Sequence, residues 1–164
     1  MNKFQLFLGG TCNSTNWREE LIPLLDHRIE YFNPVVDDWT ENRYTMELMC
    51  RKHADCVLYV ITPQMKGIYS IAEVVDDANK RPAKTVLCVL YENAGMSFDE
   101  DQRKSLQALE KMVALNGAIV IGEPEASPED KLKMTAEFMN MCCLLKLSYT
   151  RKWSDLRLEL NGVK

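Results

Sequence analysis

Residues 55–62, DCVLYVIT, form the clearest strand pattern in the chain, a continuous apolar run that ends at Pro63. A second run of this kind is KTVLCVLY at residues 84–91, and the segment between the two, residues 70–80, has the pattern of a helix. Strands that are apolar throughout are typical of a parallel sheet covered by helices on both faces. This stretch therefore predicts an α/β fold.

The same alternation of strands and helices extends from this stretch toward both ends of the chain. Further strands are predicted at residues 3–8, 29–32 and 118–122, and further helices at residues 16–25, 41–53, 99–116 and 127–145. Five such units predict a flavodoxin-like three-layer sandwich whose five-stranded parallel sheet has the order 2-1-3-4-5. We expect one domain over residues 1–147 and a polar C-terminal tail over residues 148–164, either a short helix or a strand packed on a neighbour.

The composition limits the classes of function. The 164 residues are 46% hydrophobic and 27% charged with a net charge of −4, which is typical of one globular domain and unfavourable for a nucleic-acid polymer as partner. The longest apolar runs fall far short of the roughly 20 residues that cross a bilayer. The N-terminus lacks the apolar segment of a secretion signal. We therefore expect a cytoplasmic protein without a membrane partner.

Cysteine and histidine usage gives no sign of a disulfide framework or a metal site. The six cysteines contain no CxxC pair and lie mostly in apolar runs, which favours free thiols in a reducing compartment. His27 and His53 are the only histidines, and no third ligand follows at a suggestive spacing. The prediction is a protein with neither metal nor cofactor.

In such sheets, ligands bind beyond the carboxyl ends of the strands, where the strand order reverses. This rule selects residues 9–15, 33–40 and 62–70. The first loop offers Gly9 and Gly10 for close backbone approach, and Thr11, Asn13 and Ser14 as donors to an oxygen-rich ligand. It has neither of the glycine patterns of dinucleotide or triphosphate sites, and a tight turn with a helix cap explains it equally well.

The second loop places acids and an indole beside a strand end. Asn33 and the pair Asp37 and Asp38 can hold sugar hydroxyls or base edges, and Trp39 can stack on a base. The alternative is an aspartate that caps the next helix. Both readings stay open at the level of the sequence.

The third loop leads to Glu73, in the first turn of the predicted helix 70–80. The helix dipole there favours an ionised carboxylate, which suits a nucleophile or a base. Gly67 and Ser70 lie close to it as candidate substrate-binding positions. Ser70 and Glu73 also have the spacing of a capping box, in which both would only satisfy helix-end N–H groups.

Asp76 and Asp77 follow Glu73 in the same predicted helix. The pair Asp77 and Arg81 has the i,i+4 spacing of an ion pair on a helix surface. We therefore predict a surface role for Asp77 and not a catalytic one.

Four stretches together resemble the nucleoside 2-deoxyribosyltransferase-like family. They are FLGGTCNSTNWR at 7–18, YFNPVVDDW at 31–39, ADCVLYVITP at 54–63 and GIYSIAEVVDDANKRPAKTVLCVL at 67–90. The resemblance covers roughly residues 3–90 and is most specific over residues 55–89.

The resemblance implies that Glu73 is the family's nucleophile, which attacks the anomeric carbon of a deoxyribose. Glu47 matches an acid on the helix before the third strand and is implied to contact the ligand. Many members have an aspartate six residues before the nucleophile, where this chain has Gly67, and a tyrosine in the first loop, where this chain has none. Tyr69 is the candidate replacement for the tyrosine, and Asp37 or Asp38 for the acid.

The implied activity is cleavage or transfer of the N-glycosidic bond of 2′-deoxynucleosides or their 5′-monophosphates through a covalent deoxyribosyl–glutamate intermediate. One alternative is an N-hydrolase that releases the free base. Another is a module that binds or sequesters nucleotides without turnover. The family resemblance also implies a homo-oligomer, in which the tail from residue 148 completes a neighbouring subunit's site.

Overall fold

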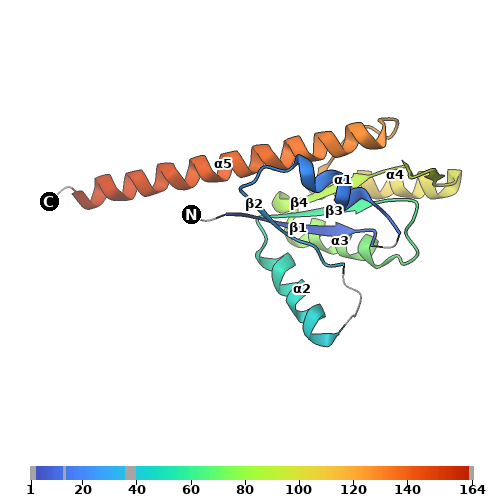
Figure 1. Ribbon diagram of the computed structural model, residues 1–164, viewed down its shortest axis with the longest axis horizontal. Coiled ribbons are helices and arrows are strands. Elements are labelled where there is room, and N and C mark those ends of the chain that lie inside the picture. The colour runs from blue at the N-terminus through green and yellow to red at the C-terminus, as the bar shows by residue number, and fades with distance from the viewer. Residues whose placement is uncertain (1–2, 13, 36–39, 163–164) are drawn as a thin grey trace.

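The structure is a computed structural model that describes residues 3–12, 14–35 and 40–162, with side chains described up to residue 146. Its main sheet has five parallel strands in the order β2-β1-β3-β4-β7. In chain order these strands are β1 (Phe4–Gly10), β2 (Ile29–Phe32), β3 (Cys56–Ile61), β4 (Thr85–Val89) and β7 (Ile119–Val120). The predicted fold class and strand order are confirmed (Figure 1).

Helices cover both faces of this sheet. They are α1 (Trp17–Leu21), the 3-10 turn η1 (Ile22–Leu24), α2 (Glu41–His53), α3 (Tyr69–Lys80), the 3-10 turn η2 (Pro82–Lys84), α4 (Glu100–Leu115) and α5 (Pro128–Gly162). A short antiparallel hairpin, β5 (Glu92–Asn93) with β6 (Met96–Ser97), follows β4. Helices α1 and α5 pack on one face, and α3 and α4 on the other. This is the three-layer sandwich expected from the sequence.

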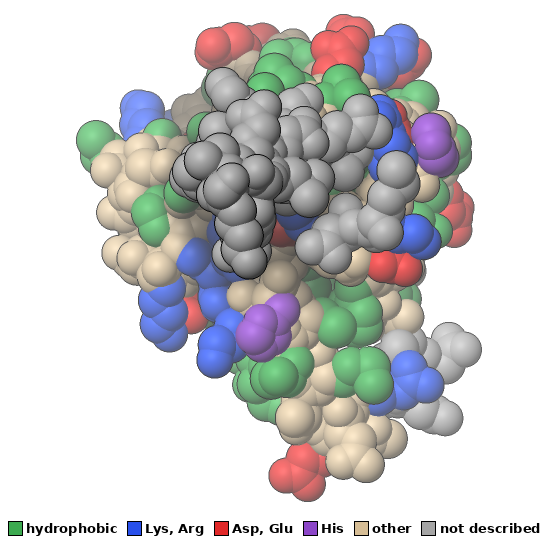
Figure 2. All heavy atoms as spheres, turned by 90° about the vertical axis from the view of Figure 1, so that its left-hand side faces the viewer, with side chains coloured by type: hydrophobic (Ala, Val, Ile, Leu, Met, Phe, Trp, Pro, Cys, Tyr) green, Lys and Arg blue, Asp and Glu red, His purple; other side chains and the backbone are tan. Residues whose placement is uncertain are grey.

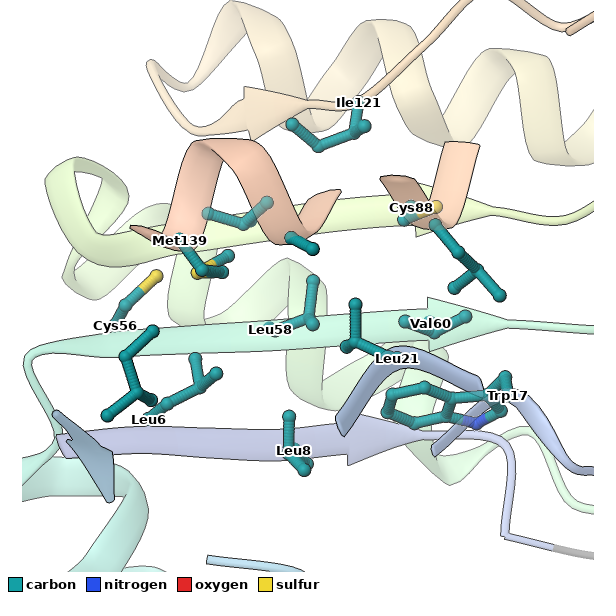
Figure 3. Packing of buried hydrophobic residues seen from close by; sticks show 14 of the residues in the cluster. Leu6, Leu8, Trp17, Leu21, Cys56, Leu58, Val60, Cys88, Ile121 and Met139 are labelled. Atoms are coloured by element: carbon teal, nitrogen blue, oxygen red, sulfur yellow. The ribbon is translucent and has the colours of Figure 1, made fainter. Parts of the chain in front are cut away.

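The period-two alternation of each strand divides the core between the two faces. Leu6 and Leu8 of β1 point to the face of α1 and α5, where Trp17, with no exposed surface, fills the space (Figure 3). Phe7 points to the other face, with Tyr59 of β3. Every residue of β3 is buried, because this strand lies in the middle of the sheet. The apolar run that predicts the fold is thus its central strand.

The first predicted helix is shorter in the structure. Residues 16–25 do not form one helix, because α1 ends at Leu21 and a 3-10 turn with Pro23 follows. Proline lacks the N–H group that would continue the helix. The prediction of a single helix here is wrong in its second half.

The C-terminal prediction needs a larger correction. Helix α5 does not end near residue 145 but continues to Gly162 and extends past the rest of the domain (Figure 1). No glycine or proline occurs between residues 129 and 161 to end it. The tail is therefore neither a strand nor a separate short helix. Its described buried hydrophobic side chains come from the first half of α5 and are Leu132, Ala136, Met139 and Cys143.

The remaining expectations concern thiols, membranes and metals. All six cysteines are free, and Cys12 in the first loop is exposed while Cys56, Cys88 and Cys143 are buried. Within the described residues, no helix has both the length and the apolar character needed to traverse a bilayer. The described side chains include no group of three or more His, Cys, Asp or Glu that is arranged to hold a metal ion.

Candidate functional site

The site is built where β1 and β3 end side by side. Gly10 closes β1 with a φ of +107°, and a β-carbon there would lie 2.1 Å from the carbonyl oxygen of Val60. Only glycine fits this approach. The next backbone N–H, that of Thr11, donates to the same Val60 oxygen at 2.9 Å. The first loop therefore leaves the sheet in a fixed direction.

Hydrogen bonds within the protein then hold the first loop. The Thr11 hydroxyl accepts from the backbone N–H of Thr62 at 2.9 Å, and Thr11 is buried. The Thr11 carbonyl oxygen accepts from Trp17 Nε1 at 3.0 Å and from Arg18 Nη1 at 2.8 Å. Ser14 is exposed, with a φ of +40°. Thr11 thus supports the loop from inside, while Ser14 faces solvent.

Glu73 lies on α3, the helix that follows β3 along the chain. Its Oε1 accepts a hydrogen bond of 2.6 Å from Nη1 of Arg51, in the last turn of α2. The Glu73 side chain is 11% exposed and that of Arg51 is 6% exposed. The two residues that the sequence separates by 22 positions thus form a nearly buried ion pair between α2 and α3.

The capping-box interpretation of Ser70 and Glu73 is wrong. Helix α3 begins at Tyr69, its N-cap residue is Ile68, and no side chain caps it. Ser70 is therefore already inside the first turn and Glu73 lies in the second turn. The carboxylate of Glu73 is therefore not used in a helix cap and instead accepts from Arg51.

The predicted ionisation of Glu73 also needs correction. Burial raises the pKa of Glu73 to about 7, against the lowering effect of Arg51. The negative charges of Glu47 and Asp77 raise it further. Because Glu73 is outside the first turn, the helix dipole does not outweigh its burial. At neutral pH the carboxyl group is divided between its two forms instead of fully ionised.

Asp77 contacts Arg51 on the buried side of α3. It has no exposed surface, and it accepts a hydrogen bond from the hydroxyl of Tyr59 at 2.7 Å. Arg81 Nη2 lies 2.5 Å from its Oδ1, and Arg51 Nε lies 3.1 Å from its Oδ2. The predicted pairing with Arg81 exists, but its assignment to the surface is wrong, because spacing along a helix does not reveal which face is buried.

Two further titratable side chains lie close to Glu73. Glu47 is one turn before Arg51 on α2 and is half-buried, and this burial raises its pKa. Tyr69 is 60% exposed at the start of α3, and a hydrogen bond with Tyr44 raises its pKa. Glu73 therefore has a second carboxyl group and a phenol within its electrostatic surroundings.

The other predicted positions are distributed as follows. Asn33 is exposed, and its Oδ1 accepts from the backbone N–H of Val35 at 3.1 Å. Gly67 is exposed, and a β-carbon there would have no atom within 4 Å. Gly9 lies against the ring of Tyr59, 2.8 Å from where its β-carbon would be. The candidates outside the described residues are Asn13, Asp37, Asp38 and Trp39.

Sequence reasoning missed three residues at the centre of the site, Arg51, Tyr59 and Asp77. The available signal was the i,i+4 spacing of Glu47 and Arg51, which places both on one side of α2. The spacing rule assigned Asp77 to the helix surface with Arg81, and no pattern in the sequence joins it to Arg51. Only the packing of α2 against α3 identifies the partners.

A separate cavity of about 440 Å³ lies between α2 and the edge of the sheet. Its lining includes Phe7, Phe32 and Cys50 but not Glu73. Hydrophobic side chains are visible on the surface of α2, which projects at the bottom of the space-filling view (Figure 2), and Met46 and Met49 are both more than half exposed. This hollow is thus distinct from the cluster around Glu73.

Comparison with known proteins places the chain in a family. A model of the family described as nucleoside 2-deoxyribosyltransferase like matches residues 3–92, more than half of the chain. The chain belongs to that family. No curated protein and no solved structure matches it. The matched region of this deoxyribosyltransferase-like protein contains the first loop, α2, β3 and α3, which together supply every described side chain of the site.

Proposed function

We propose that this protein cleaves or transfers the N-glycosidic bond of 2′-deoxynucleosides or their 5′-monophosphates, with Glu73 as the nucleophile. The observation that carries the proposal is the carboxylate of Glu73, which is nearly buried on α3 and bound by Arg51 through only one of its oxygens. Membership of the family supports the nucleoside as substrate. A nucleophilic carboxylate that forms a covalent glycosyl intermediate is a common route for glycosyl transfer.

In the first step, Oε2 of Glu73 attacks C1′ of the deoxyribose and forms an ester bond. The C1′–N bond breaks, and its electron pair goes to the departing base. Glu47 is our candidate for the acid that protonates this base, because its burial raises its pKa and favours the protonated form. The step leaves Glu73 esterified and Glu47 as a carboxylate.

In the second step, a nitrogen of an acceptor base attacks C1′ from the face that the first base left. The C1′–O bond breaks, Glu73 recovers its carboxylate, and the proton of the acceptor returns to Glu47. If water takes the place of the acceptor, the product is free deoxyribose. Transferase and hydrolase activity therefore share the first step and differ only in the acceptor.

The two buried arginines of the site are engaged mainly with protein groups. A phosphate is usually held by unpaired arginine or lysine side chains. Arg18 is 6% exposed and donates to the carbonyl oxygens of Thr11 and Leu8, and Arg51 is committed to carboxylates. Lys66, exposed in the loop before α3, is a further described cation near the site, so both 2′-deoxynucleosides and their 5′-monophosphates remain proposed substrates.

The test is an incubation with a panel of 2′-deoxynucleosides and 5′-monophosphates, with and without a second base, followed by chromatography of the products. Base exchange supports a transferase, and free base in both incubations supports a hydrolase. Glu73→Gln should abolish both reactions, and full activity of this variant excludes Glu73 as nucleophile. Intact mass spectrometry of the wild type with substrate should detect the deoxyribosyl ester.

One observation favours a binding module without turnover. Gly67 stands where many members of the family have an aspartate, and the space beside it is open. A site that lacks this acid binds a nucleoside but releases its base less readily. This second candidate predicts retention of the nucleoside without cleavage, unchanged by Glu73→Ala, which calorimetry and product analysis together distinguish from catalysis.

A further inference from the structure

The guanidinium of Arg51 contacts carboxylates along more than one edge. Nε lies 3.1 Å from Oδ2 of Asp77, and Nη2 lies 3.3 Å from Oδ1 of the same residue. Of these two contacts only that of Nη2 is a hydrogen bond, and the ion pair of Nε with Oδ2 lacks hydrogen-bond geometry. Together with the bond to Glu73 they orient the guanidinium, because its donors form a rigid fork. The outer nitrogen, Nη1, then points to Oε1 of Glu73 at 2.6 Å.

We propose that Arg51 is a positioning residue for Glu73. It holds Oε1 and leaves Oε2 as the one oxygen that faces the substrate. The proposal rests on the function proposed above for Glu73. Among the described residues, no group donates a hydrogen bond to Oε2.

The support for Arg51 is itself rigid. Asp77 is fully buried and is held by the Tyr59 hydroxyl at 2.7 Å and by Arg81 at 2.5 Å. Tyr59 belongs to the central strand, and Arg51 is buried. The orientation of Glu73 thus depends on a chain of contacts that begins in the core of the sheet. Asp76 contributes less to this series of contacts. Its Oδ2 lies 3.5 Å from Nη2 of Arg51, and its side chain is 41% exposed.

The charge of Arg51 has a second effect at the same position. The groups around Glu73 are Arg51 and Glu47 on α2, Asp76, Asp77 and Tyr69 on α3, and Tyr59 on β3. Burial and the nearby carboxylates raise the pKa of Glu73, and Arg51 lowers it. Without the guanidinium, Glu73 is protonated at neutral pH and cannot attack.

Lysine at this position separates charge from geometry. A lysine keeps the positive charge, but a single ammonium group cannot contact both oxygens of Asp77 and also orient Glu73. Methionine removes both charge and hydrogen bonds while keeping a long side chain. Arg43, exposed in the first half of α2, is the matched control, because it allows the same substitution on the same helix.

The experiment compares wild type, Arg51→Met, Arg51→Lys and Arg43→Met by two readouts. The first is the pH dependence of kcat and KM for base release. The second, independent of turnover, is a ¹³C NMR titration of the glutamate side-chain carboxyl groups, with the Glu73 signal identified from Glu73→Gln. Circular dichroism checks that each variant is folded.

We expect the wild-type Glu73 signal and the acid limb of kcat/KM to titrate near pH 7. Arg51→Met should move both midpoints upward by about one pH unit or more and lower kcat about 100-fold at pH 7, with KM nearly unchanged, because the nucleophile is protonated and misplaced. Arg51→Lys should keep the midpoint near that of the wild type but lose about 10-fold in kcat. Arg43→Met should match the wild type in both readouts.

The two proposals fail in different ways. If the wild type cleaves none of the nucleosides, the proposed function fails, and the NMR titration alone decides the role of Arg51. If Glu73 titrates at the same pH in folded Arg51→Met and in the wild type, or kcat is unchanged, Arg51 is not a positioning residue. If Arg51→Met does not fold, Arg51→Lys decides the question. A kcat of Arg51→Lys equal to that of the wild type would then show that Arg51 is not a positioning residue.

Discussion

The hydroxyl oxygen of Tyr59 lies 2.7 Å from Oδ2 of Asp77 and joins the middle of β3 to the buried side of α3. Neither side chain has any exposed surface. Asp77 also pairs with Arg51 and Arg81, so one desolvated carboxylate balances two guanidinium groups. The contact between Tyr59 and Asp77 thus holds the partner of Arg51 in place and is itself closed to solvent.

We therefore expect Asp77→Asn to be strongly destabilising. The variant leaves two guanidinium groups without their buried partner, and such a loss costs about 3–5 kcal/mol. Tyr59→Phe should cost about 1–2 kcal/mol, because it removes one hydrogen bond to a charged group. Urea unfolding followed by circular dichroism measures both losses.

The matched control for this comparison is Asp76→Asn. Its carboxylate is 41% exposed and pairs mainly with Lys80, so the expected loss is below about 1 kcal/mol. Equal losses of unfolding free energy for Asp76→Asn and Asp77→Asn would show that the buried ion pairs of Asp77 stabilise the fold no more than the exposed pair of Asp76 does.

The raised pKa of Glu73 predicts a pH dependence of stability. The ordinary pKa of 4.5 applies to the unfolded chain, whereas the folded value is about 7. Between these values the folded state keeps a proton that the unfolded state has lost, so the contribution of Glu73 to stability is present below pH 4.5 and is lost as the pH rises to about 7. The slope is at most about 1.4 kcal/mol per pH unit.

Glu73→Gln isolates this contribution, because glutamine does not titrate. The difference in unfolding free energy between the variant and the wild type should move in favour of the variant as the pH rises from 5 to 8. Denaturant unfolding at several pH values measures it. A difference that stays constant over this range would mean that Glu73 has its ordinary pKa in the folded protein.

Glu47 offers a prediction about the leaving base. If Glu47 is the acid, Glu47→Gln should lower kcat for ordinary deoxynucleosides by about 100-fold or more. The loss should nearly vanish for an analogue whose base leaves without protonation. Steady-state rates with the two substrate types measure this ratio. An equal loss with both would assign Glu47 to binding instead.

Two glycines allow a direct test of the backbone at the end of β1. Gly10→Ala should prevent stable folding or lower the unfolding free energy by several kcal/mol, because the φ of +107° is strained for alanine and its β-carbon would overlap the Val60 carbonyl. Gly67→Ala meets open space and should change stability by less than about 0.5 kcal/mol. Thermal unfolding compares the two, and a well-tolerated Gly10→Ala would contradict the described approach of β1 to β3.

The sequence was informative wherever local pattern determines structure. The apolar runs predicted β3 and β4 because a central parallel strand has to be buried on both faces. The bounds of α2 at Glu41 and His53 also match the prediction, since the segment has a threonine N-cap and a basic last turn. These features depend on residues that are neighbours along the chain.

The site depends instead on contacts between distant segments. The pairing of Arg51 with Glu73 and the burial of Asp77 follow from how α2 and α3 pack, which no spacing within one helix reveals. The same limit explains the wrong ionisation of Glu73, because the helix dipole is readable from the sequence and desolvation is not. Hence family resemblance singled out Glu73 as the candidate nucleophile, while its partners Arg51 and Asp77 were not recognised.

The extension of α5 leads to a last prediction. The described side chains of α5 that enter the core end at Cys143, and Lys146 then pairs with Asp55 at 2.5 Å. Deletion of residues 148–164 keeps all these contacts, so the shortened chain should fold cooperatively with a Tm within about 4 °C of the full chain, equivalent to less than about 1 kcal/mol. Differential scanning calorimetry measures the change.

Met139→Ala in the full chain is the matched comparison, because Met139 has no exposed surface and its truncation should cost about 2–5 kcal/mol.

Light scattering on the shortened chain tests the expected homo-oligomer separately. If the tail completes a neighbouring subunit's site, its removal should lower the molecular mass of the assembly. A shortened chain that keeps the full assembly would place the subunit contact on the domain itself, and one that fails to unfold cooperatively would show that the second half of α5 is needed for the fold.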